Sequence, residues 1–369
     1  MRTISLCIVL GAALVWSGVE RSRGSFELAE QWFLDFLVAN GREAFAKSVP
    51  AQSPEVVLVE FREEDKAEFE SWPPTPLDYL LVLNRLVEHE PDVVVFADTL
   101  AWAGSGEEFI AQLRGALVKV PSVVLGFTLS SQPSAKSEEL ADFFASEMPF
   151  LAAEEGGVEG VPRFAGVGKV ASRALRIAAQ SGFSSIEGLD TGKGYVPLVA
   201  TDGERLVPSL AVQAVSLSRR VPYAAQRLRL GAGARLSLGD EFIIPLENGG
   251  VLRPFEKLDV PRVNALELMT PDLGDASAET MRAMLGKHKV VVFGIPPGAA
   301  EHAKAIASAL ILPRVSRLPA ALDWAYAALA CGACAWLGRR GRAGAVLAAL
   351  VVTATGLAVC LGVFQSTLA

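Results

Sequence analysis

The sequence predicts an α/β fold in which a mostly parallel or mixed β-sheet is flanked by helices. Short runs of valine, leucine, isoleucine and phenylalanine recur along the chain, and stretches long enough to form helices separate them. Strands connected in this way become parallel neighbours through right-handed crossovers. Both ends of the chain are also strongly apolar. The prediction therefore adds one N-terminal and two C-terminal transmembrane helices.

The first apolar segment, residues 1–23, is interpreted as an uncleaved membrane anchor, with a cleaved signal peptide as the alternative. Residues 318–337 and 343–366 are interpreted as two further spans, each close to the roughly 20 residues that a bilayer requires. The three arginines between these spans are expected to face the cytoplasm. Residues 24–315 are then periplasmic, on a chain anchored in the lipid of the inner (cytoplasmic) membrane.

Charge and cysteine content narrow the possible functions. The 369-residue chain carries a formal net charge of −7, so it offers no general basic surface for nucleic acid. Its cysteines, Cys7, Cys331, Cys334 and Cys360, all lie in the apolar segments, and no disulfide can join parts of the region between them. Cys331 and Cys334 are interpreted as small residues that pack in a membrane helix, rather than as a redox or metal motif.

The first half of residues 24–315 reads as alternating helices and buried strands. Thr75 is suited to cap a helix, and Pro76 to occupy its first turn. Pro91 and Asp92 end the same helix. The expected elements are an amphipathic helix at 24–38, a strand at 56–59, the helix that begins after Thr75, a strand at 93–96, a helix at 107–118 and a strand at 123–127.

The second half is less regular. Residues 130–160 are polar, acidic and partly rich in glycine, and we expect a long insertion or loop there. Asp202 and Gly203 lie between apolar runs and predict a β-hairpin. The other expected elements are a helix at 210–217, a turn at 247–250 flanked by the runs 242–245 and 251–252, a buried strand at 290–293 and a helix that ends at 310.

Acidic residues follow the first two strands. Glu60, Glu63, Glu64 and Asp65 come after the first strand, and Asp98 comes after the second. Because the carboxyl ends of parallel strands share one edge of a sheet, these side chains are expected to gather where α/β proteins bind ligands. A solvated loop is the alternative for the run after the first strand. The candidate ligand-binding residues are Glu60, Asp65, Trp72 and Asp98.

Other motifs have simpler interpretations. Trp72 precedes two prolines and either rims a pocket or packs in the core. Residues 294–298 separate a strand from a helix, but they lack the spacing of a phosphate loop, and two prolines remove donors, so a plain turn is favoured. His89, His288 and His302 lack the spacing of metal ligands. His302 is interpreted as one member of a surface pair with its acidic neighbour. No cofactor or metal is expected.

Several stretches together carry a family resemblance. They are the helix at 26–38, the strand at 56–61 with the Ser-Trp-Pro-Pro at 71–74, residues 88–100, the Asp-Gly turn at 202–208, residues 244–252 and the strand at 289–294. In this order, over roughly residues 24–315, they resemble a CHASE2 domain. CHASE2 domains are extracytoplasmic sensory domains of bacterial membrane receptors. Residues 202–208 depart from the family's Asp-Gly-x-x-Arg-x-x-Pro turn, because either Arg205 falls one residue early or the turn is shorter.

The resemblance implies a membrane-anchored extracytoplasmic sensor or interaction module that binds an unknown signal or small ligand. No cytoplasmic domain is expected after Ala369, so the sensor is expected to act on a separate signalling protein through its membrane helices. Homodimer formation is left open. The alternative is a membrane-anchored exported α/β enzyme, which needs a nucleophile, a base and an orienting group that the sequence does not provide. A structural relic is a third reading. We expect a sensor and not an enzyme.

Overall fold

The computed structural model describes residues 49–312, apart from residues 103–106, 134–136, 156, 159, 190–193, 231–233, 240–241, 248, 271–282 and 287–288. These residues belong to one unit, Val49–Leu312. The predicted anchor, the helix at 24–38 and both C-terminal spans lie outside the described residues. Within the described part of the chain, no helix combines the length and the apolar character needed to cross a membrane.

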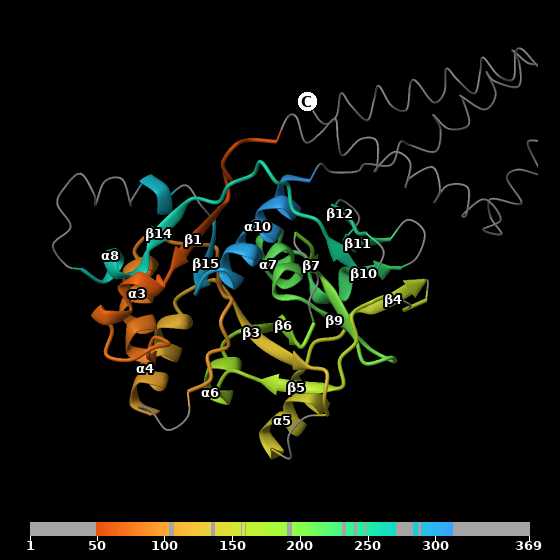
Figure 1. Ribbon diagram of the computed structural model, residues 1–369, viewed down its shortest axis with the longest axis horizontal. Helices are drawn as coiled ribbons and strands as arrows, with labels where there is room; N and C mark the ends of the chain where they lie inside the picture. Colours follow the sequence, from red (N-terminus) through yellow and green to blue (C-terminus); the bar gives the residue numbers. More distant parts are fainter. Residues whose placement is uncertain are drawn as a thin grey trace, which may run out of the picture. The chain divides into compact units, whose positions relative to one another are not determined.

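A mixed sheet lies at the centre of the described unit (Figure 1). Its strands run in the order β14-β1-β15-β2-β3, and β3 pairs with both β5 and β6. Every pairing is parallel except that of β3 with β5. The strands are β1 (Val56–Glu60), β2 (Val93–Phe96), β3 (Ser122–Ser130), β5 (Gly166–Lys169), β6 (Gln180–Glu187), β14 (Arg262–Asn264) and β15 (Val290–Gly294). The predicted α/β fold with a mostly parallel or mixed sheet is confirmed.

Helices cover both faces of this sheet, which explains why β1, β2 and β15 are buried along their whole length. One face carries α3 (Pro76–Val87), α4 (Glu107–Leu117) and α8 (Ala265–Met269), and its core includes Phe61, Tyr79, Phe96 and Phe293. The other face carries α7 (Leu210–Ser218) and α10 (Gly298–Ile311), which pack on the central strands (Figure 1).

Helix α3 begins as the sequence predicts. The Thr75 side chain accepts a hydrogen bond from the Asp78 backbone amide, and the Asp78 carboxylate accepts one from the Thr75 amide. This reciprocal capping box satisfies two backbone donors at the start of the helix. Pro76 occupies the first helical position, where its missing amide hydrogen has no consequence. The capping box therefore determines the residue at which α3 begins.

The stretch 130–160 is more ordered than the expected loop. It contains α5 (Glu138–Asp142), the π-helix η2 (Phe143–Glu147) and β4 (Ala152–Glu155). Phe143 is fully buried and packs edge-on against Phe127 of β3. Two acidic residues of this stretch form ion pairs, because the buried Arg176 lies 3.0 Å from Glu139 and 2.7 Å from Glu147. Buried aromatic surface and paired charges therefore order a segment whose composition suggested a loop.

The predicted hairpin at Asp202 and Gly203 is confirmed. Strands β8 (Val199–Thr201) and β9 (Leu206–Pro208) pair antiparallel around it. Gly203 has a φ of 105°, which favours glycine. The Asp202 carboxylate accepts hydrogen bonds from the backbone amides of Glu204 and Arg205 at 3.0 and 2.7 Å.

The two strands that flank the turn at 247–250 do not pair with each other. Instead, β12 (Phe242–Pro245) joins β11 (Arg235–Leu238), β10 (Gln226–Arg229) and β4 in a separate sheet. Strand β13 (Val251–Leu252) pairs with β7 (Val196–Pro197). The remaining elements are η1 (Glu63–Glu68), α6 (Arg173–Arg176) and η3 (Tyr223–Ala225).

Candidate functional site

The carboxyl ends of β1, β15 and β2 lie side by side at one edge of the sheet. Glu60 is in register with Gly294, and Phe96 is in register with Phe293. The acidic residues predicted for this edge are present, but their side chains do not form one cluster. Glu60 lies between two residues that face α3, so its own side chain projects from the opposite face. Asp98 contacts α3.

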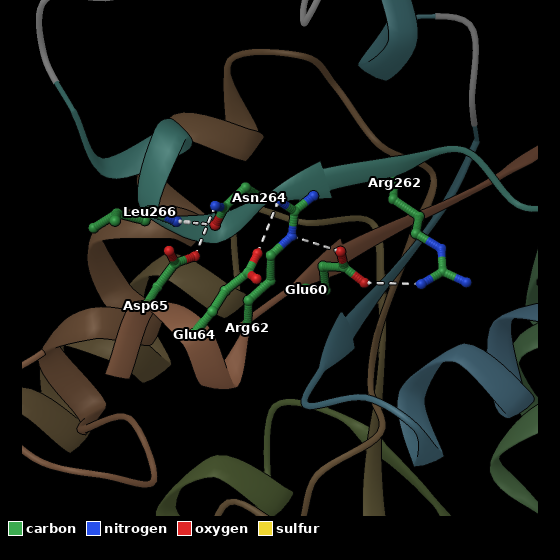
Figure 2. A network of polar contacts seen from close by, with 7 residues as sticks. All are labelled: Glu60, Arg62, Glu64, Asp65, Arg262, Asn264 and Leu266. Carbon is green, nitrogen blue, oxygen red and sulfur yellow. Dashed lines mark hydrogen bonds and ion pairs between the residues drawn. The ribbon is translucent and has the colours of Figure 1, made fainter. Parts of the chain in front are cut away.

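Glu60 is held by two arginines, as Figure 2 shows. Its side chain is only 5% exposed, and Arg62 Nε lies 2.8 Å from Oε1. Arg262 Nη1, from β14, lies 3.4 Å from Oε2. Hydrogen bonding to Glu60 raises the pKa of Arg62, which also contacts Glu64 at 3.5 Å. Both oxygens of this buried carboxylate are therefore compensated, as a buried charge requires.

Asp65 belongs to a neighbouring set of contacts. Its Oδ2 accepts a hydrogen bond of 2.8 Å from the Asn264 side chain. Asn264 in turn accepts one of 2.9 Å from the Leu266 amide and caps α8 (Figure 2). Asp65 therefore ties η1 to the junction of β14 and α8. Glu63 and Glu64 on η1 are exposed, as the solvated-loop alternative expects for these two residues.

Trp72 lies among aromatic residues. It is half-buried, its ring centroid is 5.8 Å from that of Phe69, and it packs against the core on the α3 face. Nearby, Trp102 donates a hydrogen bond of 3.0 Å to the Pro74 carbonyl and contacts the Tyr79 ring edge-on. These contacts agree with the core-packing interpretation of Trp72. Tyr79 contacts Trp102 and also donates a hydrogen bond to Asp98. Trp72, Trp102 and Tyr79 therefore form an aromatic wall on the side of Asp98 where α3 lies.

Asp98 connects three segments of the fold. Its Oδ2 accepts a hydrogen bond of 3.0 Å from the Tyr79 hydroxyl on α3. The same oxygen accepts one of 2.9 Å from the Ile295 backbone amide, which begins the turn between β15 and α10. A Cβ at Gly294 would come within 3.1 Å of this oxygen and 2.8 Å of the Ala299 Cβ. The glycine at this position therefore allows β15 to approach Asp98 closely.

The surroundings of Asp98 favour its protonated form. Burial raises the pKa of Asp98 to about 6, although the hydrogen bonds from Tyr79 and Ile295 act in the opposite direction. Burial, followed by the charge of Asp98, raises the pKa of Tyr79 well above its usual value. A carboxyl group with a perturbed pKa at the carboxyl-end edge of an α/β sheet is a candidate functional group on physical grounds.

A comparison with protein families identifies the family to which this chain belongs. A model of the CHASE2 domain matches residues 6–332, which is most of the chain. The chain belongs to the CHASE2 family. CHASE2 domains are extracellular sensory domains rather than catalytic ones. Comparisons with curated proteins and with solved structures give no match. The CHASE2 match extends beyond residues 24–315 at both ends, into the apolar segments.

His302 of the CHASE2 domain corrects one interpretation. It is not part of a surface pair, because α10 turns it inward and its exposure is only 8%. Its Nε2 lies 2.7 Å from the Ser184 carbonyl on β6 and must donate, because a carbonyl only accepts. Burial lowers the pKa of His302. The sequence hides this role, because Glu301 beside it is exposed and suggests a solvated helix face.

The CHASE2 domain has no metal centre among the residues that the structure describes, where no three His, Cys, Asp or Glu side chains are grouped to hold an ion. His288 and all four cysteines lie outside the described residues. The turn at 294–298 leads into α10, with Ile295 bonded to Asp98. The sequence had pointed to Asp98, but gave no sign of its partner Tyr79 on α3.

Proposed function

We propose that this CHASE2 protein is a membrane-anchored extracytoplasmic sensor that binds a small signal at the carboxyl-end edge of its central sheet. The observation that carries the proposal is Asp98, which links α3, β2 and the start of α10 through one carboxyl oxygen. Helix α10 ends at Ile311, and six residues separate it from residues 318–337. A signal that alters the Asp98 contacts therefore acts on the helix that leads into the proposed membrane segments.

The candidate residues have different proposed roles. Asp98 contacts the signal, because its partly exposed carboxyl group lies at the edge and is bonded to a phenol and a backbone amide rather than to a cation. Trp72 shapes the aromatic wall beside it. Glu60 and Asp65 hold the ends of β1 and β14 in place through Arg62, Arg262 and Asn264. A signal that requires this edge must then compete with, or rearrange, the hydrogen bonds of Asp98.

The proposal places the domain in the periplasm, with residues 1–23, 318–337 and 343–366 as spans of the inner membrane. The extracellular character of CHASE2 domains supports this topology. The arginines between the last two spans support it independently. The state of the domain reaches a separate signalling protein through contacts between small residues of the membrane helices.

Reporter fusions test the topology. A reporter that is active only in the periplasm is expected to be active when fused after Gly126, and one that is active only in the cytoplasm to be inactive there. Fusions after Arg340 provide the matched control, because the arginines between the spans predict the opposite result. Cytoplasmic activity after Gly126 would refute the exported-domain proposal.

Capture of a partner tests the output. The full chain in detergent is expected to retain a membrane protein that carries a cytoplasmic signalling domain. Replacing residues 343–366 with a polyleucine span of equal length keeps the anchor but removes the small residues that allow close helix packing. Signalling through the membrane helices would be contradicted if the polyleucine variant retained the partner as well as the unmodified chain does. It would also be contradicted if the unmodified chain retained no such protein.

A further inference from the structure

The chain enters and leaves the described domain on the same side (Figure 1). The unit runs from Val49 to Leu312. Glu55 lies just before β1, and Leu310 lies in the last turn of α10. A single nitrogen, Nη2 of Arg219, donates a hydrogen bond of 3.0 Å to Glu55 Oε1 and another of 3.0 Å to the Leu310 carbonyl. One side chain therefore joins the entry of the domain to its exit.

Arg219 also contacts the second sheet. It directly follows α7, and its guanidinium carbon lies 5.1 Å from the centroid of the Phe242 ring on β12. At this distance the cation is attracted to the face of the ring. The side chains of Arg219 and Glu55 are only 20% and 28% exposed, so solvent screens their ion pair less than it screens a surface pair. Arg219 therefore joins three parts of the fold: β12, the start of β1 and the end of α10.

The end of α10 needs a group of this kind. The last carbonyls of a helix have no partner within the helix, and they carry a partial negative charge. The last turn of α10 contains no basic residue of its own. Arg219 supplies the positive charge from the end of α7, and it satisfies the Leu310 carbonyl at the same time. The contact therefore holds the end of α10 in place.

One donor of Arg219 is not satisfied. Its Nε is buried and has no hydrogen-bond partner among the residues that the structure describes. A buried donor without a partner raises the free energy of the folded state, which offsets part of what the two Nη2 bonds contribute. The arrangement is therefore only modestly favoured over one in which the guanidinium regains water. A contact of this kind can be shifted by a signal that binds the two arrangements with different affinity.

Helix α10 connects this contact to the edge that carries Asp98. It runs from Gly298 to Ile311 and packs on β1, β15 and α7. The turn before it is bonded to Asp98 through the Ile295 amide at 2.9 Å, and its last turn is bonded to Arg219. Because packed helices shift as units, a displacement at the Asp98 end of α10 also moves the carbonyl that Arg219 holds.

We propose that Arg219 is a positioning residue for the output of this sensor. It holds the end of α10 against the start of β1, and a signal that shifts α10 breaks this contact and frees the two ends of the domain from each other. The inference rests on the proposed function, in which both ends lead to membrane spans. It names the side chain through which the state of the domain reaches those spans.

A second connection keeps the domain folded when Arg219 is released. The segment between β13 and β14 lies between the same two ends. The Ser53 amide donates a hydrogen bond of 2.8 Å to the Asp259 carbonyl. The Phe255 amide donates one of 3.0 Å to Ser308 Oγ on α10. Loss of the Arg219 contact is therefore expected to loosen the spacing of the ends without unfolding the domain.

Pulsed electron paramagnetic resonance of the full chain in detergent tests the proposal. Spin labels at Gln52→Cys and Leu312→Cys report the distance between the two ends, after serine replaces the four native cysteines. A single narrow distance is expected in this background. Arg219→Gln is expected to lose that narrow distance and to give a broad distribution that extends to longer distances.

Arg176→Gln is the matched control. This arginine is also buried and also pairs with carboxylates, but its partners, Glu139 and Glu147, belong to α5 and η2. The control is expected to keep the single narrow distance. It therefore separates a general loss of stability from the loss of the link between the two ends.

Glu55→Ala keeps the test decisive if Arg219→Gln does not fold. It removes one of the two Nη2 bonds and leaves the bond to Leu310, so a partial broadening is expected. The positioning role is refuted if Arg219→Gln keeps the narrow distance, or if Glu55→Ala does so where Arg219→Gln does not fold. It is also refuted if Arg176→Gln broadens the distribution as much as Arg219→Gln does.

The measurement is independent of the topology and of the partner. No signal, partner or membrane orientation enters it. Cytoplasmic activity of a reporter after Gly126 would refute the exported domain and leave the distances as they are. An unchanged distance in Arg219→Gln would refute the positioning role and leave the topology as it is.

Discussion

Two glycine-to-alanine substitutions, Gly294→Ala and Gly115→Ala, are expected to change stability in opposite directions. At Gly294, the added Cβ would lie 2.8 Å from the Ala299 Cβ and 3.1 Å from Asp98 Oδ2. The first distance is shorter than packed carbon atoms allow, and both neighbours are fixed by the junction of β15 and α10. The strand must therefore move, and the bond between Asp98 and the Ile295 amide must adjust with it.

The magnitudes follow from the same distances. Forcing an extra carbon into a packed site costs about 1–3 kcal/mol. Gly115 is exposed in the last turn of α4, and no atom lies within 4 Å of an added Cβ. Alanine there is expected to raise the free energy of unfolding by about 1 kcal/mol, because glycine is the poorer helix former. The two variants should therefore differ by about 2–4 kcal/mol, although the chemical change is identical.

Urea unfolding of the full chain in detergent measures this difference, with tryptophan fluorescence as the signal. Trp72 and Trp102 both pack near the site and report on the fold of the domain. If Gly294→Ala is as stable as the unmodified chain while Gly115→Ala gains stability, the close approach of β15 to Asp98 is wrong. If Gly115→Ala loses stability, the open position assigned to Gly115 on α4 is wrong.

Three further substitutions test the charged contacts by the same unfolding assay. Asp98→Asn is expected to raise the free energy of unfolding at pH 7 by up to about 3 kcal/mol, because burial raises the pKa from 3.8 to about 6 and each pKa unit corresponds to about 1.4 kcal/mol. That gain should shrink to about 0.5 kcal/mol at pH 4, and a gain independent of pH would contradict the assignment. Glu60→Gln should cost about 1–3 kcal/mol, because it leaves two arginines without their buried carboxylate, and a neutral outcome would contradict the network in Figure 2. Arg205→Lys should lower the free energy of unfolding by about 1–2 kcal/mol, because the guanidinium lies 4.3 and 4.4 Å from the Phe144 and Phe150 ring centroids. If Phe144→Leu lowers that free energy equally in the unmodified chain and in Arg205→Lys, the stacking of Arg205 on Phe144 contributes nothing.

The elements that sequence reasoning found are those whose signal is local. Valine-rich runs mark β1, β2 and β15, because strands covered on both faces need no polar alternation. Thr75 and Pro76 mark the start of α3 through capping chemistry confined to one turn. The hairpin at Asp202 is equally local. In each case a few adjacent residues determine the structure, without reference to distant parts of the chain.

The elements that were missed depend on partners far away in the sequence. Strand β6 is rich in serine and glycine, and it is a strand because it lies along β3 and under α7. Strand β14 is three residues long and is defined by its pairing with β1. The inward turn of His302 depends on the Ser184 carbonyl, which lies 118 positions earlier in the chain. Periodicity within a short window carries no information about such partners.

The candidate site shows a finer limit. The sequence correctly indicated that Glu60 and Asp98 lie at the carboxyl ends of two strands of one sheet, β1 and β2, although β15 lies between these strands. It did not indicate that their side chains point to opposite faces, because a shift of one residue reverses the face. The side chain of Asp98 reaches Tyr79 on the α3 face, and that of Glu60 reaches Arg262 across the end of β14. Ligand contact at these residues, and at Asp65 and Trp72, stays a prediction.

The order of strands has a consequence for how the domain is assembled. Strand β15 is the last strand of the described sheet in the sequence, yet it lies between β1 and β2, and residues on both sides pair with it. A growing chain that has not reached Gly294 therefore has a gap at the centre of its sheet, with two valine-rich edges unpaired. Such edges are prone to wrong pairing. Because closure joins Val56 to Val290, folding is expected to be slow and completed only when the C-terminal strand arrives.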